Sequence, residues 1–175
     1  MRAACVGAFL AAGAVPAAAD GIETAGRAVA VAIPVTAAGI ALFKDDYDGI
    51  LQDSVSTIAA VGTAFALKSV IHEQRPDHSD YHSFPSETTA GAFAGAAFLQ
   101  KRYGWSYGLP AYALAAFVGY SRIESKRHHW YDVAAGAAIG WGWSYLLTDR
   151  YNRVAISAYP GYAGRPLGFD IEMRW

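Results

Sequence analysis

The middle of the chain consists of apolar stretches separated by polar turns. The stretches cover residues 28–43, 54–67, 89–99, 107–120 and 133–147. Each is longer than an ordinary buried strand and therefore predicts a helix. Alanine and glycine are frequent in all of them, so the helices can approach one another closely. The pattern predicts an all-α fold, a bundle of about five core helices.

The C-terminal part of the chain changes from this pattern to a period of two. Apolar and polar residues alternate over 167–175, and residues 154–159 are a second strand candidate. Proline and glycine between them, at 160–166, indicate a turn. We therefore predict a short β-hairpin tail, residues 151–175, docked on the helices. Two strands are too few for a membrane barrel, which needs at least about eight.

The N-terminal residues have the features of a secretory signal peptide. Arg2 supplies a positive charge, residues 6–15 are a short apolar run, and Ala17 to Ala19 offer a small-residue cleavage site before Asp20. We predict a signal peptide at 1–19, followed by a helical domain at 20–150. The alternative is an uncleaved first membrane helix, although the apolar run is short for a span.

Composition narrows the class of protein. The chain has 175 residues, enough for one domain, and 54% of them are hydrophobic, which excludes a disordered chain. A net charge of −1 argues against nucleic-acid binding. Cys5 is the single cysteine, so the chain cannot be a disulfide scaffold. The apolar stretches are shorter than the roughly 20 residues of a typical span. A soluble helical core therefore remains possible, but we favour a membrane protein.

Three clusters carry the candidate chemistry. In the first, Lys68 precedes Arg75 by seven residues and Pro76 follows. Seven residues are two helical turns, so both cations are predicted to project from one helix face and to form an anion site. The alternative is a pair of solvated cations.

The second and third clusters add a helix start and a histidine. Ser86 is a candidate N-cap, which leaves backbone N–H groups to face an anion. Arg122 follows Ser121, and His128 precedes Asp132 by four residues. On a helix that carboxylate can fix the tautomer of the imidazole, which makes the other ring nitrogen a nucleophile or base. Taken alone, the second cluster could be an ordinary helix cap, and the third could be a surface His–Asp pair.

Together the clusters resemble the signature of the phosphatidic acid phosphatase type 2 superfamily, K-x6-R-P, P-S-G-H and S-R-x5-H-x3-D. The superfamily also includes vanadium-dependent haloperoxidases and bacterial acid phosphatases. The first and third motifs match at every specified position, and the resemblance covers roughly residues 26–148. It implies that His128 attacks phosphorus to form a phosphohistidine and that Asp132 orients it. The phosphate-binding residues that it implies are Lys68, Arg75, Ser86 and Arg122.

The resemblance also implies a reaction and a setting. No metal or organic cofactor is implied. We expect a phosphatase acting on a phosphomonoester or diphosphate, with a lipid phosphate as its partner molecule. The expected location is the bacterial cell envelope, in the inner membrane or periplasm, with the site facing the periplasm. All three clusters are predicted at one end of the bundle. Lys101 and Arg102 are predicted at the opposite, cytoplasmic end.

The second motif departs from the family pattern. Glu87 stands in place of glycine and Thr88 in place of the histidine that the family is implied to use as general acid. Threonine cannot donate a proton at neutral pH. Glu87 could be the acid, water could protonate an activated diphosphate leaving group, or another histidine could supply the proton. The candidate histidines between the motifs are His72, His78 and His82.

Two rival functions remain. A pseudo-phosphatase would bind lipid phosphate through the same cations without turnover, which the change at Thr88 suggests. A haloperoxidase would use His128 to coordinate vanadate, but this chain has little room for the additional helices of those enzymes. A metal site at His78 and His82 is a further possibility, although that loop lacks additional ligands.

Overall fold

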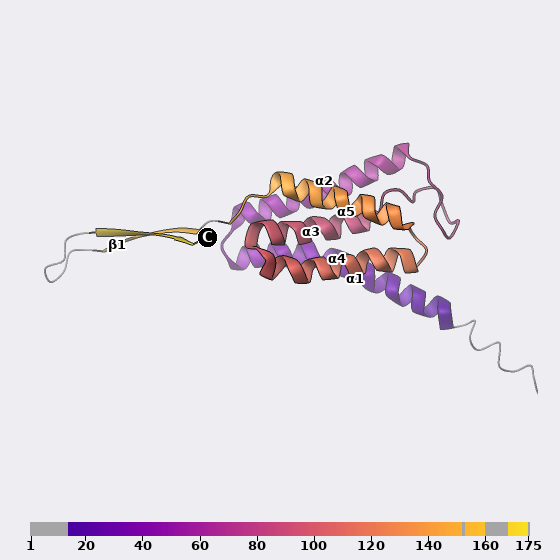
Figure 1. The fold of residues 1–175 in the computed structure, drawn as a ribbon, viewed down its shortest axis with the longest axis horizontal. Helices are drawn as coiled ribbons and strands as arrows, with labels where there is room; N and C mark the ends of the chain where they lie inside the picture. The colour runs from indigo at the N-terminus through magenta and orange to yellow at the C-terminus, as the bar shows by residue number, and fades with distance from the viewer. Residues whose placement is uncertain (1–13, 152, 160–167, 175) are drawn as a thin grey trace, which may run out of the picture.

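The computed structural model describes residues 14–151, 153–159 and 168–174. Its helices are α1 (Ala14–Phe43), α2 (Tyr47–Val70), α3 (Glu87–Tyr103), α4 (Trp105–Glu124) and α5 (Trp130–Leu147). They form an up-and-down bundle in which successive helices run in opposite directions (Figure 1). The predicted helical bundle is therefore confirmed in its class and its number of helices.

Helix α3 lies at the centre of the bundle and packs against each of the other four helices. Most of its residues are buried, and many of these are alanine or glycine. The small side chains let the neighbouring backbones come close. At Gly136 of α5, a Cβ atom would lie 2.3 Å from the carbonyl oxygen of Ser86. This contact fixes the start of α5 against the start of α3, which is the end where the candidate residues lie.

The helices are longer than the apolar stretches suggested. The described helices contain between 17 and 30 residues, whereas the stretches contained 11 to 16. The polar residues Asp48 and Gln52, which lie outside those stretches, are inside α2. Within the described residues, Gly21–Phe43 and Tyr47–Val70 are long and apolar enough to cross a membrane. For these two helices, the argument that the apolar stretches are too short to span a membrane was therefore wrong.

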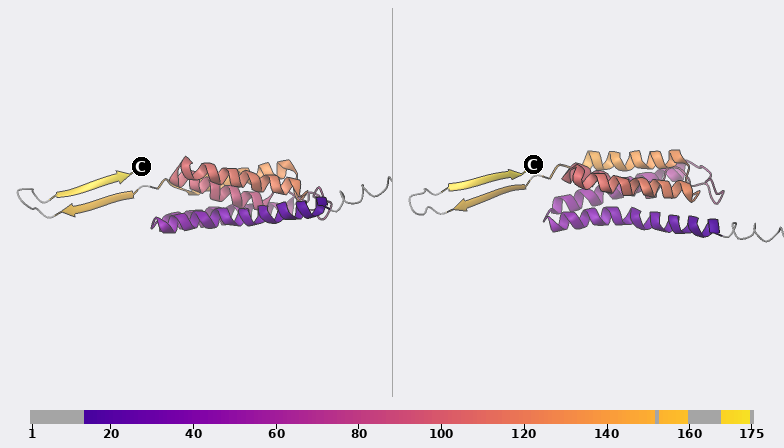
Figure 2. Two further views of the ribbon diagram at one scale, coloured as in Figure 1. Left: turned by 90° about the horizontal axis from the view of Figure 1, so that it is seen from below. Right: turned by 60° about the horizontal axis from the view of Figure 1, so that its bottom comes forward.

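The tail forms the predicted hairpin, from β1 (Arg153–Tyr159) and β2 (Gly168–Arg174). The strands pair antiparallel, with Arg153 opposite Arg174. The hairpin projects from the bundle, and within the described residues neither strand contacts a helix (Figures 1 and 2). The expected docking on the helices was wrong: among the described residues, the strands contact each other and no helix.

The predicted signal peptide lies largely outside the described residues, which begin at Ala14. From there α1 continues without a break through the proposed cleavage point to Phe43. Cleavage after Ala19 therefore stays a prediction.

A buried ion pair closes the end of the bundle opposite the candidate residues. Arg102 donates from Nε to Asp46 Oδ2 at 2.8 Å, and Tyr103 donates to the same oxygen at 2.6 Å. Arg102 also donates to the carbonyl of Asp149 at 2.9 Å. These bonds join the α1–α2 turn, the end of α3 and the segment after α5. Lys101 and Arg102 lie at the end of α3 opposite the candidate residues, as the sequence predicted, and Arg102 is buried and paired there. The cytoplasmic location of this end stays a prediction.

We expect Arg102→Ala to lower the free energy of unfolding by about 3–5 kcal/mol, because it leaves the buried Asp46 carboxylate without its partner. The matched control is Arg150→Ala, since Arg150 is exposed at the same end; it should change stability by less than about 0.5 kcal/mol. Denaturant unfolding of both variants in detergent micelles measures the difference. Equal stability of the two variants would contradict a structural role for the pair.

Candidate active site

The structure brings the sequence clusters together at one end of the bundle, on the right in Figure 1. Lys68 lies in the last turn of α2 and Arg122 in the last turn of α4. Ser86 is the N-cap of α3, and Asp132 lies in the first turn of α5. The alternating directions of the helices therefore place the ends of α2 and α4 beside the starts of α3 and α5.

Two of the candidate residues lie in loops rather than helices. Helix α2 ends at Val70, before Arg75, and α5 begins at Trp130, after His128. The predictions that Lys68 and Arg75 share a helix face, and that helical spacing pairs His128 with Asp132, were therefore wrong. The chain leaves α2 in an extended conformation and folds back on itself, which brings the loop between α2 and α3 over the site.

The imidazole of His128 is held by a backbone carbonyl. His128 is only 3% exposed, and its Nδ1 lies 2.7 Å from the carbonyl oxygen of Ser83. A carbonyl only accepts hydrogen bonds, so this contact assigns the proton to Nδ1. Asp132 Oδ2 is more distant, at 3.6 Å from Nδ1. Nε2 is consequently the ring nitrogen with a free lone pair.

Asp132 supports His128 through Ser83 as well as directly. The Ser83 hydroxyl donates to Asp132 Oδ2 at 2.5 Å, and the backbone N–H of His129 donates to the same oxygen at 2.8 Å. Both the Ser83 hydroxyl and the His129 N–H are therefore held by the Asp132 carboxylate, which is fully buried. Sequence reasoning missed Ser83. It stands just before the second motif, but the use of its carbonyl is not visible in any pattern of side chains.

The arginines of the first and third motifs are anchored by acidic and carbonyl groups. Arg122 is 2% exposed and donates to the carbonyl of Glu23, in α1, at 2.6 Å. Arg75 donates from Nε to Asp80 at 2.7 Å. These partners fix the orientation of each guanidinium and leave part of its donor fork for another anion.

Lys68 forms an ion pair with Glu87, which stands where the family pattern has glycine. Its Nζ lies 2.9 Å from Glu87 Oε2 and donates to the carbonyl of His82 at 2.7 Å. The negative charge of Glu87 is therefore balanced by Lys68, as its place beside a phosphate site requires. The pairing also means that an incoming phosphate competes with Glu87 for this cation.

Ser86 and Thr88 have different surroundings. The Ser86 hydroxyl accepts from the N–H of Thr89 at 3.4 Å and lies 2.9 Å from the Thr89 hydroxyl, so Ser86 caps α3 as expected. Its side chain is fully buried. Thr88 lines the same cleft as His128. A histidine at position 88 would therefore line the same cleft as the candidate nucleophile.

A cleft of about 580 Å³ opens at the candidate residues. Its lining combines charged and polar residues with apolar residues of α1 and α2. The polar lining consists of Arg27, Thr57, Arg75, Glu87, Thr88, Arg122 and His128. An adjoining cavity of about 340 Å³ shares Arg75 and Glu87 and adds Lys68 and His82. A ligand with an anionic head and an apolar body matches the lining of the cleft.

The surroundings of His128 favour its neutral form. Burial lowers the pKa of His128 below its ordinary value, and the positive charges of Lys68 and Arg75 lower it further, against the opposing effect of Asp132. A neutral imidazole retains the lone pair on Nε2 that a nucleophile needs.

This environment predicts a pH dependence. We expect kcat/KM to fall with decreasing pH only below pH 6.5, the ordinary pKa of histidine, because the lowered pKa keeps His128 neutral to a lower pH. Lys68→Gln removes a charge that lowers this pKa, so the acid limb should move to higher pH. Lys101→Gln, at the opposite end, should leave it in place. A pH–rate profile of the three proteins that shows one common acid limb would contradict this assignment.

The other histidines occupy varied positions. His82 lines the smaller cavity, whereas His72 and His78 are exposed on the loop. His129 caps α5 and stacks on the ring of Tyr131. Glu73, His129 and Asp132 place one ligand atom each within 4.8 Å of one another, which would allow a metal ion. Glu73 and Asp132 already accept hydrogen bonds from Tyr131 and Ser83, so the group also serves as a hydrogen-bond network.

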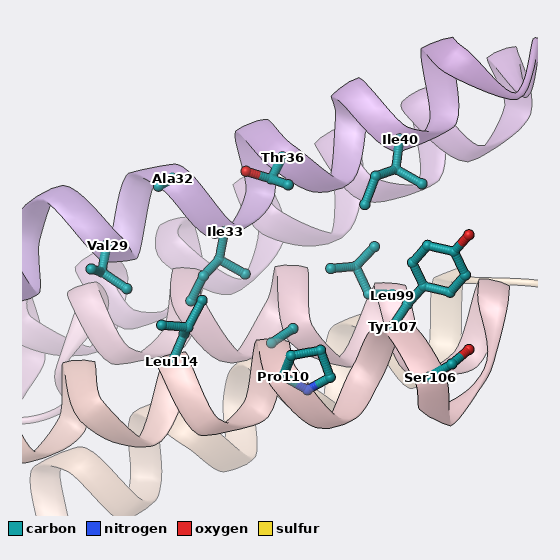
Figure 3. Close-up of a pocket in the computed structure, with 11 residues that line it drawn as sticks. Val29, Ala32, Ile33, Thr36, Ile40, Leu99, Ser106, Tyr107, Pro110 and Leu114 are labelled. Atoms are coloured by element: carbon teal, nitrogen blue, oxygen red, sulfur yellow. The ribbon is translucent and has the colours of Figure 1, made fainter.

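A separate groove of about 270 Å³ lies between α1 and α4. Figure 3 shows Val29 and Ile33 of α1 pointing toward Pro110 and Leu114 of α4. Its lining is almost entirely apolar and includes none of the candidate catalytic or phosphate-binding residues. The groove matches hydrocarbon rather than a charged group.

Comparison with known proteins gives consistent matches. The sequence model of the PAP2 superfamily matches residues 51–155. The lipid A 4'-phosphatase of Helicobacter pylori is 32% identical over 139 residues, which cover 73% of this chain and 70% of that protein.

Two solved structures are similar in fold. LpxE of Aquifex aeolicus superposes with a TM-score of 0.55 at 21% identity, over 69% of this chain and 83% of that one. The first transmembrane PAP2 type phosphatidylglycerolphosphate phosphatase from Bacillus subtilis gives a TM-score of 0.51 at 25% identity, over 82% of this chain and 86% of that one.

Proposed function

The chain belongs to the PAP2 superfamily, and from this premise we propose that it is a membrane-bound phosphatase of a lipid phosphomonoester or diphosphate. We place its site on the periplasmic side of a bacterial inner membrane. The observation that carries the proposal is His128, whose Nδ1 faces the Ser83 carbonyl while the residue lines a cleft bordered by arginines.

The proposed reaction has two displacements. In the first, Nε2 of His128 attacks phosphorus, and the bond from phosphorus to the leaving oxygen breaks, giving a phosphohistidine. In the second, water attacks phosphorus and the P–N bond breaks, releasing inorganic phosphate and restoring the imidazole. Lys68, Arg75 and Arg122 stabilise the charge on the phosphoryl oxygens. Asp132 and Ser83 hold the ring and stabilise its positive charge.

The leaving group sets the demand on a general acid. An alkoxide must be protonated as it leaves, and Thr88 cannot supply that proton. A diphosphate leaves as a phosphate-bearing product that is already stable at neutral pH. Glu87 is the carboxylic group among the described residues that line this cleft, and it is already paired with Lys68 at 2.9 Å. The site therefore favours diphosphates over simple phosphomonoesters.

The surface of the bundle supports a membrane location. Large apolar side chains are exposed along α1, α2, α4 and α5, including Val31, Val35, Ile58 and Phe65. Helix α2 has 24 residues, which corresponds to about 36 Å and exceeds the roughly 30 Å thickness of the hydrocarbon layer. Trp105 at one end and Trp130 at the other are also exposed, as expected of aromatic residues at the two membrane interfaces.

A lipid substrate is supported by the two cavities beside α1. The cleft that contains His128 continues along apolar residues of α1, including Ala30, Pro34 and Val35. The groove between α1 and α4 is almost entirely apolar (Figure 3). A phosphate held at the cations would therefore have hydrocarbon-compatible surface next to it.

A second candidate function is a lipid-phosphate-binding pseudo-phosphatase. The Lys68–Glu87 ion pair and the absence of a histidine at position 88 favour it. Such a protein would keep the arginines and bind phosphate without releasing it from a substrate.

The deciding experiment measures phosphate release by the purified protein in detergent micelles from phosphatidate, diacylglycerol pyrophosphate and a prenyl diphosphate. Turnover of the diphosphates, with slower turnover of phosphatidate, is expected. Binding of these lipids with no release from any of them would support the pseudo-phosphatase instead.

A further inference from the structure

Arg27 is a cation of the cleft that no sequence motif includes. It lies on α1 and lines the cleft together with Arg75, Arg122 and His128. Its side chain is 62% exposed, compared with 7% for Lys68, 16% for Arg75 and 2% for Arg122. Among these four cations, Arg27 therefore has the most freedom to turn toward a ligand.

Glu23 connects Arg27 to the rest of the site. Its carboxylate lies 2.5 Å from Arg27, 3.0 Å from Arg127 and 3.8 Å from Arg122. Arg127 is also paired with Asp77, at 3.1 Å. Three guanidinium groups therefore share the carboxylates of Glu23 and Asp77, and positive charge exceeds negative charge by one among these five groups. This excess allows Arg27 to bind a further anion.

The position of α1 at the site is fixed by close packing. A Cβ atom on Gly26 would lie 1.8 Å from the Ser121 hydroxyl oxygen, so only glycine allows α1 to pack this tightly on α4. The buried Arg122 also donates to the Glu23 carbonyl at 2.6 Å. Arg27 therefore stands at a fixed place on the rim of the cleft, although its side chain is exposed.

We propose that Arg27 forms a subsite for a second anionic group of the substrate, beside the phosphate that His128 attacks. The inference rests on the proposed function and narrows it to lipids that carry a second phosphate close to the scissile one. Lys68, Arg75 and Arg122, which the proposed function assigns to the reacting phosphate, are largely buried, whereas Arg27 is exposed and lines the cleft from α1. A lipid with a single phosphate leaves Arg27 without a ligand.

Two kinds of lipid offer this chemistry. In a diphosphate the second phosphate is directly bonded to the first, and in phosphatidylglycerol phosphate a glycerol separates them. An alternative role for Arg27 is contact with membrane headgroups in general, because arginine commonly extends to the interface. That role would affect all lipid substrates alike.

The first test compares Arg27→Ala with Arg150→Ala, an exposed arginine at the other end of the bundle. Substrates are diacylglycerol pyrophosphate, phosphatidylglycerol phosphate and phosphatidate in mixed micelles. We expect Arg27→Ala to raise KM about tenfold for at least one substrate with two phosphates, to leave KM for phosphatidate unchanged, and to leave kcat nearly unchanged. The substrate whose KM rises more shows whether the subsite accepts a phosphate bonded directly to the reacting one or a phosphate separated from it by a glycerol. An equal change for all three substrates would overturn the subsite.

The second test does not require turnover and thus separates this inference from the proposed function. Isothermal titration measures binding of inorganic pyrophosphate and of orthophosphate to the parent protein and to Arg27→Ala. We expect the parent to prefer pyrophosphate by about tenfold and the variant to lose that preference. A parent with no preference, or with no measurable binding of either anion, overturns the subsite even if the protein is an active phosphatase.

Discussion

Replacing His128 by alanine is expected to lower kcat for phosphate release by about 10⁴-fold or more, because His128 is the only imidazole among the described residues that line the cleft. The surrounding cations would remain in place and would still bind phosphate. The measurement is phosphate release from the substrate that the parent protein turns over fastest, together with the melting temperature of each protein, so that loss of folding is recognised.

A covalent phosphohistidine provides the accompanying test. Rapid quenching of the parent protein with a substrate labelled in the reacting phosphate should trap label that is labile to acid and stable to base. The His128→Ala variant should trap none. Tyr120→Ala is a suitable control because Tyr120 is exposed near the same end of the bundle; it should trap as much label as the parent. Unchanged turnover in His128→Ala would overturn the proposed mechanism.

Replacing Thr88 by histidine is expected to increase the rate of hydrolysis of phosphatidate by about 10²–10⁴-fold, the usual contribution of a positioned general acid. Thr88 lines the cleft with His128, so the new imidazole would stand beside the leaving group. Diacylglycerol pyrophosphate should gain much less, because its leaving group is stable without protonation. Steady-state kinetics with both lipids measure the difference.

The matched control for this gain is Thr88→Gln, which adds a side chain of similar size that cannot donate a proton as an acid. Equal rates for the histidine and glutamine variants would contradict the missing-acid explanation. If Glu87 were the acid, Thr88→His would have little effect and Glu87→Gln would abolish activity. If the Thr88→His variant has activity and the natural protein has none, the natural protein is a pseudo-phosphatase that binds lipid phosphate through its cationic side chains.

Lys68 and Glu87 illustrate the limit of motif reasoning. The sequence identified Lys68 by its spacing from Arg75 and identified Glu87 as a departure from the family pattern. Only the structure shows that the two side chains form an ion pair, at 2.9 Å. The two residues are 19 positions apart, and the loop between α2 and α3 decides whether they meet.

At Arg75 and His128, too, the sequence identified the residues but not their local structure. Their separations from Lys68 and Asp132 match helical spacing, which suggested helices at both places. The helices end before Arg75 and start after His128 because the chain adopts other conformations around the site, stabilised by bonds such as that of Arg75 to Asp80. The residue types therefore identified the candidate site, whereas the helical conformation inferred from their spacing was wrong.

The sequence by itself determined the class of fold, the number of helices, the hairpin and the family motifs. These depend on patterns between residues that are near in the chain, namely hydrophobic runs, alternation and fixed spacings. The tertiary structure decided which groups meet. It placed the Ser83 carbonyl on His128, Glu87 on Lys68, Arg102 on Asp46, and Arg27 in the cleft. Such contacts depend on how helices pack and loops return, and backbone groups that accept hydrogen bonds leave no trace in the pattern of side chains.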